Sequence, residues 1–167
     1  MPQLSQSRLV AVLIGVAFVI FDQWIKLLAL VALKAQSYSF GNSVAWMDVS
    51  LSLNPGAFLS LGANLAPGLK QLIFVVAVGV VCCWAIGWAL SRWTRAPLKA
   101  VSVYFIALGG ISNLIDRVAR DGHVVDYLVL NLGSLHTGVF NLADIAIMAG
   151  AVVLAVDGLT KPSKAKV

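Results

Sequence analysis

The sequence contains no glutamate, and only 11% of its 167 residues are charged. Because soluble globular domains carry about 25% charged residues, an ordinary water-soluble domain is excluded. Hydrophobic residues make up 60% of the chain. This composition also excludes intrinsic disorder, which needs low hydrophobicity and high charge. The length predicts one membrane-embedded domain that covers residues 1–167.

Several kinds of hydrolytic or ligand site are also absent. Metalloproteases of the H-E-x-x-H type need a glutamate, and the chain has neither a G-x-S-x-G motif nor a Walker-type glycine loop. Cys82 and Cys83 are adjacent in an apolar run, a spacing that suits neither a disulfide nor a metal site. We interpret them as small apolar residues, and His123 and His136 as loop residues. No metal and no cofactor are predicted.

Four apolar runs are long enough to cross a membrane, since a spanning helix needs about 20 residues. They cover residues 8–33, 69–90, 98–115 and 140–159. The predicted fold class is an all-α membrane protein, a bundle of four transmembrane helices with a small β-rich segment on its outer face.

The positions of lysine and arginine predict the orientation. One side holds Arg8, Arg92, Arg95, Lys99, Lys161, Lys164 and Lys166, and the other holds Lys34, Lys70, Arg117 and Arg120. The cytoplasmic side of a membrane protein carries the excess of basic residues, so both termini are expected in the cytoplasm. The net charge of +5 is then explained by basic residues at the membrane surface and not by binding of nucleic acid. No nucleic-acid partner is predicted.

The two longer connections on the outer side contain strand patterns. Residues 48–54 alternate between polar and apolar side chains, which is typical of a half-buried strand. Asn54-Pro55-Gly56 follows as a turn, and residues 123–130 are rich in β-branched residues. We expect a small sheet that rests on the outer surface of the membrane.

Charged residues inside the apolar runs are expensive and indicate function or tight pairing. Asp22 and Lys26 are four residues apart in the first run, so they share one helix face. We interpret them as a buried ion pair that fixes helix packing. A direct chemical role is less expected, because Lys26 would keep Asp22 ionised.

Two similar segments end the third run and begin the fourth: Asn113-Leu114-Ile115-Asp116 and Asn141-Leu142-Ala143-Asp144. Because these two runs are antiparallel, both segments lie at the outer end of the bundle. Asn141 and Asp144 also fit a helix capping box, and Asp116 with Arg117 fits an interfacial ion pair. A structural and a chemical role both remain open for these residues.

Asp126 lies between Val125 and Tyr127 in the second β-prone segment. By itself it is typical of an aspartate in a turn or at a strand edge, but it is expected at the same membrane level as Asp144. Two close carboxylates cannot both ionise cheaply. One then acts as a base toward water and the other donates a proton to a carbonyl oxygen. Such a pair can hydrolyse a peptide bond without a metal.

Five segments in order make the chain similar to one family. They are Asp22-Gln23 with Lys26, Asn54-Pro55-Gly56-Ala57, Asn113-Leu114-Ile115-Asp116-Arg117, Val124-Val125-Asp126-Tyr127 and Phe140-Asn141-Leu142-Ala143-Asp144. With these segments the sequence resembles the bacterial lipoprotein signal peptidases, or signal peptidase II, over nearly its whole length.

The resemblance implies an intramembrane aspartyl endopeptidase of the bacterial inner membrane, with its active site near the outer face. Its substrate would be a diacylglyceryl-modified prolipoprotein, cut before the lipidated cysteine, and membrane lipids would be its other partners. Asp126 and Asp144 map onto the catalytic aspartates. The residues that map onto substrate-binding or supporting positions are Asn54, Gly56, Asn113, Asp116, Arg117 and Asn141. Asp22 and Lys26 map onto a structural pair.

The sequence departs from the family pattern at Phe58, where a second alanine is common, and at Ser112, where glycine is common. These departures concern substrate range more than the aspartates. Two alternatives remain open: a non-catalytic relative that binds lipoproteins, and a small proton or ion transporter. The aspartates gather on one side of the membrane instead of crossing it, which argues against a transporter.

Overall fold

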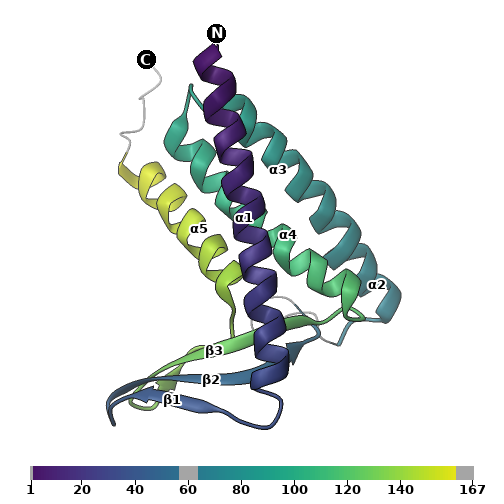
Figure 1. The fold of residues 1–167 in the computed structure, drawn as a ribbon, viewed down its shortest axis with the longest axis vertical. Coiled ribbons are helices and arrows are strands. Elements are labelled where there is room, and N and C mark those ends of the chain that lie inside the picture. The colour runs from purple at the N-terminus through teal and green to yellow at the C-terminus, as the bar shows by residue number, and fades with distance from the viewer. Residues whose placement is uncertain (1, 57–63, 161–167) are drawn as a thin grey trace.

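Four long apolar helices lie side by side, and a small sheet crosses one end of the bundle (Figure 1). The computed structural model describes residues 2–56 and 64–160. The helical elements are α1 (Pro2–Ala32), α2 (Pro67–Gln71), a π-helical turn η2 (Leu72–Ala77), α3 (Val78–Arg92), α4 (Pro97–Ala119) and α5 (Leu142–Thr160). Segments α2, η2 and α3 form one apolar stretch over Gly68–Arg92. The four predicted membrane-spanning helices are confirmed as helices long and apolar enough to cross a membrane.

The helix bounds differ from the predicted runs at two outer ends. Helix α4 continues to Ala119, beyond the predicted end at residue 115. Asp116 and Arg120 pair along this extra turn at 2.5 Å, which offsets the cost of placing two charges there. Helix α5 begins at Leu142 rather than residue 140, because Asn141 caps it.

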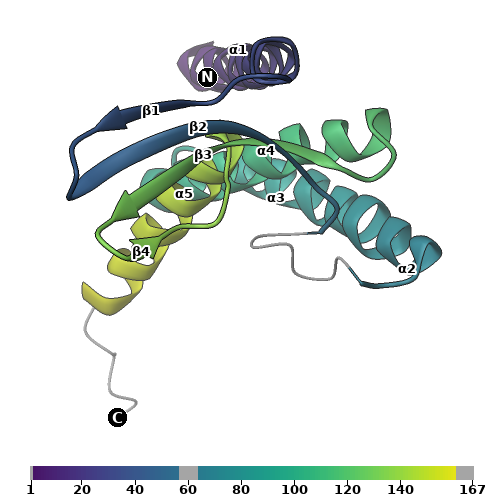
Figure 2. The ribbon, with the colours of Figure 1, turned by 90° about the horizontal axis from the view of Figure 1, so that it is seen from below.

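The sheet has four antiparallel strands in the order β1-β2-β3-β4. They are β1 (Tyr38–Gly41), β2 (Ala45–Asn54), β3 (Val124–Leu132) and β4 (Leu135–His136). Seen from below, the strands run across the end of the helices (Figure 2). The two predicted strands are confirmed within β2 and β3. The prediction missed β1 and β4, which are short and fully exposed and therefore carry no burial alternation.

A bulge in β2 determines which side chains face Asp126. The β2–β3 register shifts between Val49 and Ser52, so that Ser52 pairs with Asp126. Without the extra residue, Leu51 would lie opposite Asp126, because a one-residue slip moves every side chain to the other face. The bulge therefore places Ser52 and Asn54 on the Asp126 face of the sheet.

The first residues of β3 are packed against the end of α1. Val125 and Tyr127 are buried in a cluster with Ala29 of α1 and with Leu33, the residue that follows α1. Successive side chains of a strand point to opposite faces, so Asp126 points away from this cluster. The apolar contact with α1 thus directs the Asp126 carboxylate toward the interior between the sheet and the other helices.

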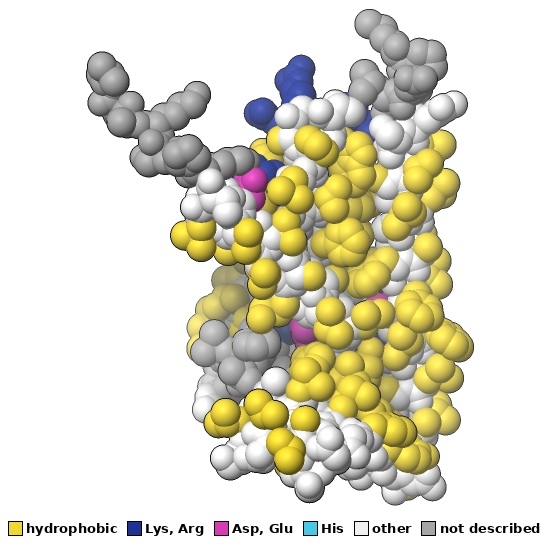
Figure 3. Space-filling view, turned by 90° about the vertical axis from the view of Figure 1, so that its left-hand side faces the viewer, with side chains coloured by type: hydrophobic (Ala, Val, Ile, Leu, Met, Phe, Trp, Pro, Cys, Tyr) yellow, Lys and Arg dark blue, Asp and Glu magenta, His cyan; other side chains and the backbone are white. Residues whose placement is uncertain are grey.

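Small residues allow the helices to approach closely, as is usual in membrane bundles. At the contact of α4 with α5, a Cβ on Gly109 would lie 2.4 Å from the carbonyl oxygen of Ala143. The outward surface is apolar between the two ends of the bundle, and lysine and arginine gather at the end opposite the sheet (Figure 3). Ala143, which forms this α4–α5 contact, is the residue directly before Asp144 in the sequence.

We predict that Gly109→Ala destabilises the protein by about 1–3 kcal/mol, because the added methyl group meets a backbone carbonyl that cannot move freely. The matched control is Gly87→Ala in α3, where nothing lies within 4 Å of a built Cβ. This control should be neutral or stabilise by about 0.5–1 kcal/mol. Thermal unfolding in one detergent measures both. Equal melting temperatures for the two variants would contradict the packing argument.

Candidate active site

Asp126 from β3 and Asp144 from the first turn of α5 line one cavity of about 250 Å³. Asn54, Asn113 and Arg117 line the same cavity. The structure therefore brings together the two aspartates that the sequence placed at one membrane level. The described residues contain no group of three or more histidine, cysteine or acidic side chains arranged to hold a metal ion.

Asp144 is also part of the N-terminal cap of α5. The Asn141 Oδ1 accepts the backbone N–H of Asp144 at 3.0 Å, and the Asp144 Oδ2 accepts the backbone N–H of Asn141 at 3.1 Å. This reciprocal pair is the capping box that the sequence suggested. The cap fixes the Asp144 carboxylate at the positive end of a helix dipole, which favours its ionised form.

The two other free N–H groups at the start of α5 also have side-chain acceptors. The backbone N–H of Leu142 donates to the Tyr127 hydroxyl at 3.2 Å, and that of Ala143 donates to Asp22 Oδ1 at 3.0 Å. Since the first N–H groups of a helix have no partner within the helix, these bonds attach α5 to β3 and α1. The position of Asp144 is therefore set by three separate elements.

Two asparagine amides connect the carboxylates. Asn113 Nδ2 donates to Asp144 Oδ1 at 2.8 Å, and Asn141 Nδ2 donates to Asp126 Oδ1 at 2.7 Å. Asn113 Oδ1 accepts from the Lys26 ammonium at 2.8 Å, and an ammonium can only donate. The orientation of the Asn113 amide is thus fixed by chemistry, and its NH₂ group must face Asp144.

Asp126 accepts a hydrogen bond on each oxygen. Besides the bond from Asn141, Asn54 Nδ2 donates to Asp126 Oδ2 at 2.9 Å. Burial raises the pKa of Asp126 to about 6. The amide of Asn54 lowers this pKa and the charge of Asp144 raises it. Burial therefore shifts Asp126 toward its protonated form, so that it keeps a proton to higher pH than a free aspartate does.

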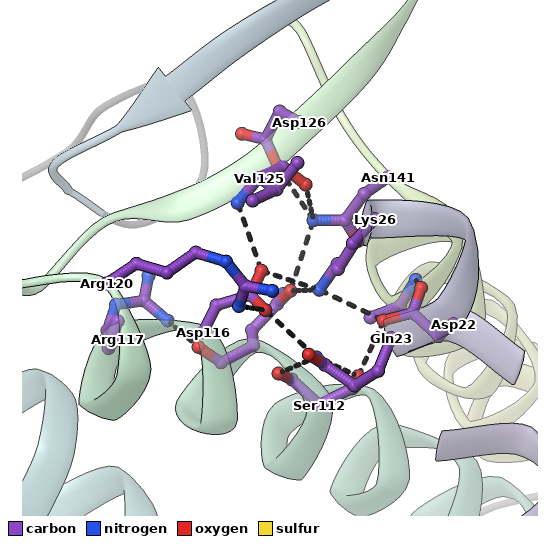
Figure 4. Close-up of polar contacts among 12 residues, drawn as sticks. Asp22, Gln23, Lys26, Ser112, Asp116, Arg117, Arg120, Val125, Asp126 and Asn141 are labelled. Carbon is purple, nitrogen blue, oxygen red and sulfur yellow. Dashed lines mark hydrogen bonds and ion pairs between the residues drawn. The ribbon is translucent and has the colours of Figure 1, made fainter. Parts of the chain in front are cut away.

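A fully buried ammonium lies behind the two aspartates. Lys26 Nζ is 3.0 Å from Asp22 Oδ2 and 3.0 Å from Asp116 Oδ2, and all three side chains have no exposed area. With Asn113, these acceptors use all three ammonium N–H groups. Figure 4 shows the side chains converging from α1, α4 and β3. The predicted Asp22–Lys26 pair is present, but it belongs to a larger network.

Asp116 is the second centre of this network. It accepts hydrogen bonds from Gln23 at 2.9 Å, from Arg120 at 2.5 Å and from the backbone N–H of Val125 at 3.0 Å (Figure 4). The last bond ties the start of β3 to α4. Ser112, a departure from the family pattern, donates to Asp22 Oδ2 at 2.5 Å, so its hydroxyl belongs to the same buried network.

The expected pairing of Asp116 with Arg117 is wrong. Asp116 forms its ion pairs with Lys26 and Arg120. The Arg117 guanidinium instead donates to the carbonyl of Gly56 at 2.6 Å and to that of Asn113 at 3.3 Å. Neighbouring residues of a helix point about 100° apart, so Asp116 faces α1 while Arg117 faces the end of β2.

Hydrogen bonds fix both the first and the last residue of the Asn54-Pro55-Gly56 turn. The backbone N–H of Gly56 donates to Asn54 Oδ1 at 2.9 Å, which leaves the Asn54 NH₂ group for Asp126. Ala57 and Phe58 lie outside the described residues. Two other aspartates, Asp48 and Asp121, do not line the cavity of Asp126 and Asp144. Asp48 binds Ser39 and Asn131 in the sheet, and Asp121 lies in the turn before β3.

The sequence did not identify the roles of Gln23, Tyr127 and Arg120. Arg120 had a detectable signal, since it follows Asp116 by four residues on a helix. Gln23 and Tyr127 lie in the family segments named above. Gln23, however, contacts Asp116, which is 93 positions away, and Tyr127 contacts Leu142, which is 15 positions away. Such distant contacts leave no periodic pattern in the sequence.

Comparison with known proteins shows the family of the chain. A family model described as signal peptidase (SPase) II matches residues 14–160. The chain belongs to the signal peptidase II family. It is therefore a membrane-bound protease of bacterial lipoprotein processing.

Similar relatives cover most of the chain. The lipoprotein signal peptidase of Cupriavidus taiwanensis is 34% identical over 163 residues, which is 96% of this chain and 88% of the relative. That of Paraburkholderia phytofirmans is 35% identical over 151 residues, or 89% of this chain and 84% of the relative.

Two solved structures of bacterial membrane enzymes have the same fold. Each has a TM-score of 0.76, with 23% and 22% sequence identity. The first match covers 94% of this chain and 92% of the solved chain. The second covers 92% of this chain and 94% of the solved chain.

We predict that Lys26→Met destabilises the protein by about 3–5 kcal/mol, because it leaves the buried carboxylates of Asp22 and Asp116 without their shared cation. The double variant Asp22→Asn/Lys26→Met removes one charge of each sign and should recover part of the loss. Lys34→Met, at an exposed lysine, is the control and should change stability by less than about 0.5 kcal/mol. Denaturant unfolding measures all three variants. A double variant less stable than Lys26→Met would refute the charge-pairing argument.

Proposed function

We propose that this chain is an aspartic endopeptidase that removes the signal peptide from diacylglyceryl-modified prolipoproteins by cutting before the lipidated cysteine. The observation that carries the proposal is the shared cavity of Asp126 and Asp144. Each carboxylate has both oxygens held by donors, so both are pre-oriented before the substrate arrives. The alternatives are a non-catalytic lipoprotein-binding relative and a small transporter.

The surroundings of the two carboxylates support different roles. Asp144 lies at a helix N-terminus and receives the amide that Lys26 orients, and both features stabilise an ionised carboxylate. Asp126 lies on a strand, and its pKa is raised to about 6, chiefly by burial. We assign Asp144 as the general base and Asp126 as the general acid. The pair still titrates jointly.

The reaction then follows from these two roles. Asp144 takes a proton from a water molecule as the water oxygen bonds to the scissile carbonyl carbon. Asp126 gives its proton to the carbonyl oxygen, which forms a neutral tetrahedral intermediate. When the intermediate collapses, the C–N bond breaks and the nitrogen takes the proton from Asp144. Asp126 recovers a proton from one hydroxyl group of the intermediate, whose oxygen becomes the carbonyl oxygen of the carboxylic acid product.

The arrangement of charges supports the proposed orientation. The first residues of α1, the α3–α4 connection and the end of α5 lie at one end of the bundle, and the sheet lies at the other (Figure 1). The connection carries Arg92, Arg95 and Lys99, which favours the cytoplasm. We therefore assign the termini to the cytoplasm and the dyad to the outer face of the inner membrane, where a lipid-anchored substrate would meet it.

We predict that purified protein cuts a diacylglyceryl-modified prolipoprotein in the presence of a chelator, and that Asp126→Asn and Asp144→Asn each reduce kcat by at least about 100-fold. Asp48→Asn changes a half-buried aspartate of the sheet outside the cavity and should retain the parent rate. Cleavage is followed by gel shift, and substrate binding is measured in parallel. A parent protein that binds substrate without cutting it would favour the non-catalytic alternative.

The pH profile tests which carboxyl group carries the proton. The Asn54 hydrogen bond favours the ionised form of Asp126, so Asn54→Ala should raise the pKa of Asp126. The protonated acid would then persist to higher pH. The alkaline limb of the kcat/KM profile should therefore move to higher pH, while the maximal kcat/KM falls. A limb that stays in place, or moves to lower pH, would contradict the assignment of Asp126 as the acid.

A further inference from the structure

A second cavity, of about 600 Å³, lies beside the dyad and shares Arg117 with it. It is formed by the outer ends of two apolar helices, and the residues that matter here are Lys70, Phe74, Arg117, Val118, Asp121 and His123. The reaction steps proposed above use none of these residues. The lining combines two cationic side chains, one carboxylate and an apolar wall.

Two charged groups of this cavity have no ion-pair partner among the described residues, and a third has an unpaired N–H. Among the described residues, no ion pair within 4.0 Å involves Lys70 or Asp121. Arg117 Nε is buried and has no acceptor in the described part of the chain, although a buried polar group without a partner is costly. The guanidinium is held at its Nη atoms by two carbonyls and lies over the Phe74 ring at 5.4 Å.

Two other basic side chains beside the cavity are already engaged. Arg120 pairs with Asp116, and the His123 ring nitrogen Nδ1 lies 3.2 Å from the Arg120 carbonyl. The charged groups left for a ligand are thus the Lys70 ammonium, the Arg117 Nη–H groups that the two carbonyls do not use, and the Asp121 carboxylate. Two donors that prefer an anion and one acceptor that prefers a cation match a zwitterion.

The cavity lies at the level where lipid head groups meet the protein. Lys70 and Arg117 are each within a few residues of the end of an apolar stretch, Gly68–Arg92 and Pro97–Ala119. Val118 lines the cavity and is 69% exposed, so an apolar chain can leave the cavity along the helix surface. Because each apolar stretch is long enough to span the hydrocarbon core, its end lies among the phosphates.

We propose that this cavity binds the head group of a phospholipid that carries a primary ammonium, with its phosphate on Lys70 and the Arg117 guanidinium and its ammonium on Asp121. The acyl chains follow Val118. Binding does not depend on the peptidase activity.

The lipid also acts on the dyad, and this consequence rests on the proposed function. Arg117 holds the carbonyl of Gly56, the N–H of Gly56 holds Asn54, and Asn54 donates to Asp126. A phosphate on the guanidinium fixes the group at the start of this chain of contacts. The bound lipid therefore stabilises the position of the Asp126 carboxylate.

The experiment is native mass spectrometry of the full-length protein in detergent, with phosphatidylethanolamine, phosphatidylcholine or diacylglycerol added. Retention should fall in that order, because the second lipid lacks a primary ammonium and the third lacks a phosphate. Lys70→Gln and Asp121→Asn should each weaken phosphatidylethanolamine retention roughly tenfold. Asp121 has a φ of 48°, which asparagine also tolerates, so this substitution removes only the charge. Lys34→Gln is the control and should bind like the parent.

Three results would overturn the proposal. Retention of phosphatidylethanolamine by both charge variants at the parent level would show that Lys70 and Asp121 do not bind the lipid. Equal retention of diacylglycerol would show that no phosphate is recognised. Displacement of the lipid by an equal concentration of inorganic phosphate would assign the site to a soluble anion. Cleavage assays in vesicles with and without phosphatidylethanolamine then test the effect on the dyad separately, so a loss of peptidase activity alone leaves the binding result intact.

Discussion

The rest of the structure depends on one buried ammonium group. Lys26 Nζ lies among Asp22, Asp116 and the Asn113 amide at 2.8–3.0 Å, with no exposed side-chain area. A lone charge at this depth is costly, so α1 and α4 must stay in register to supply its acceptors. Asp22 also accepts the N–H of Ala143, which brings α5 to the same point. The ammonium thus holds three membrane-spanning helices together by a charge requirement that apolar contacts in lipid do not provide.

This requirement is passed on to the two aspartates through atoms whose roles cannot be exchanged. The ammonium only donates, so Asn113 must present its oxygen to Lys26 and its NH₂ group to Asp144. The cap of α5 orients Asn141 in the same way, because Asn141 Oδ1 receives the N–H of Asp144 and its NH₂ group must face Asp126. The two carboxylates are therefore held by amides of fixed orientation. Such pre-organisation is what a site needs if charge moves during the reaction.

The sequence predicts the fold well where a pattern is local. Apolar runs of 18 or more residues mark the helices, two-residue alternation marks β2, and the spacing of Asn141 and Asp144 marks a cap. It predicts the partners of charged residues poorly, because these depend on how elements pack. Asp116 was assigned to its neighbour Arg117, yet its cations come from α1 and from one turn further along α4. The bulge between Val49 and Ser52 is likewise invisible in the alternation of residues 48–54, although it decides that Asn54 reaches Asp126.

The structural role of Asp144 in the cap is compatible with the catalytic role proposed for it. Its Oδ2 completes the cap of α5, and its Oδ1 receives Asn113 inside the cavity. Each carboxylate oxygen has two lone pairs, so both oxygens keep capacity for a water molecule. The cap fixes the side-chain rotamer, and the helix dipole stabilises the negative charge that a base requires. Asp126 has no helix terminus behind it and is buried on a strand, which favours the protonated form. In the proposed mechanism the asymmetry of the pair comes from the secondary structure that carries each residue: the helix N-terminus supports Asp144 as the base, and the buried strand supports Asp126 as the acid.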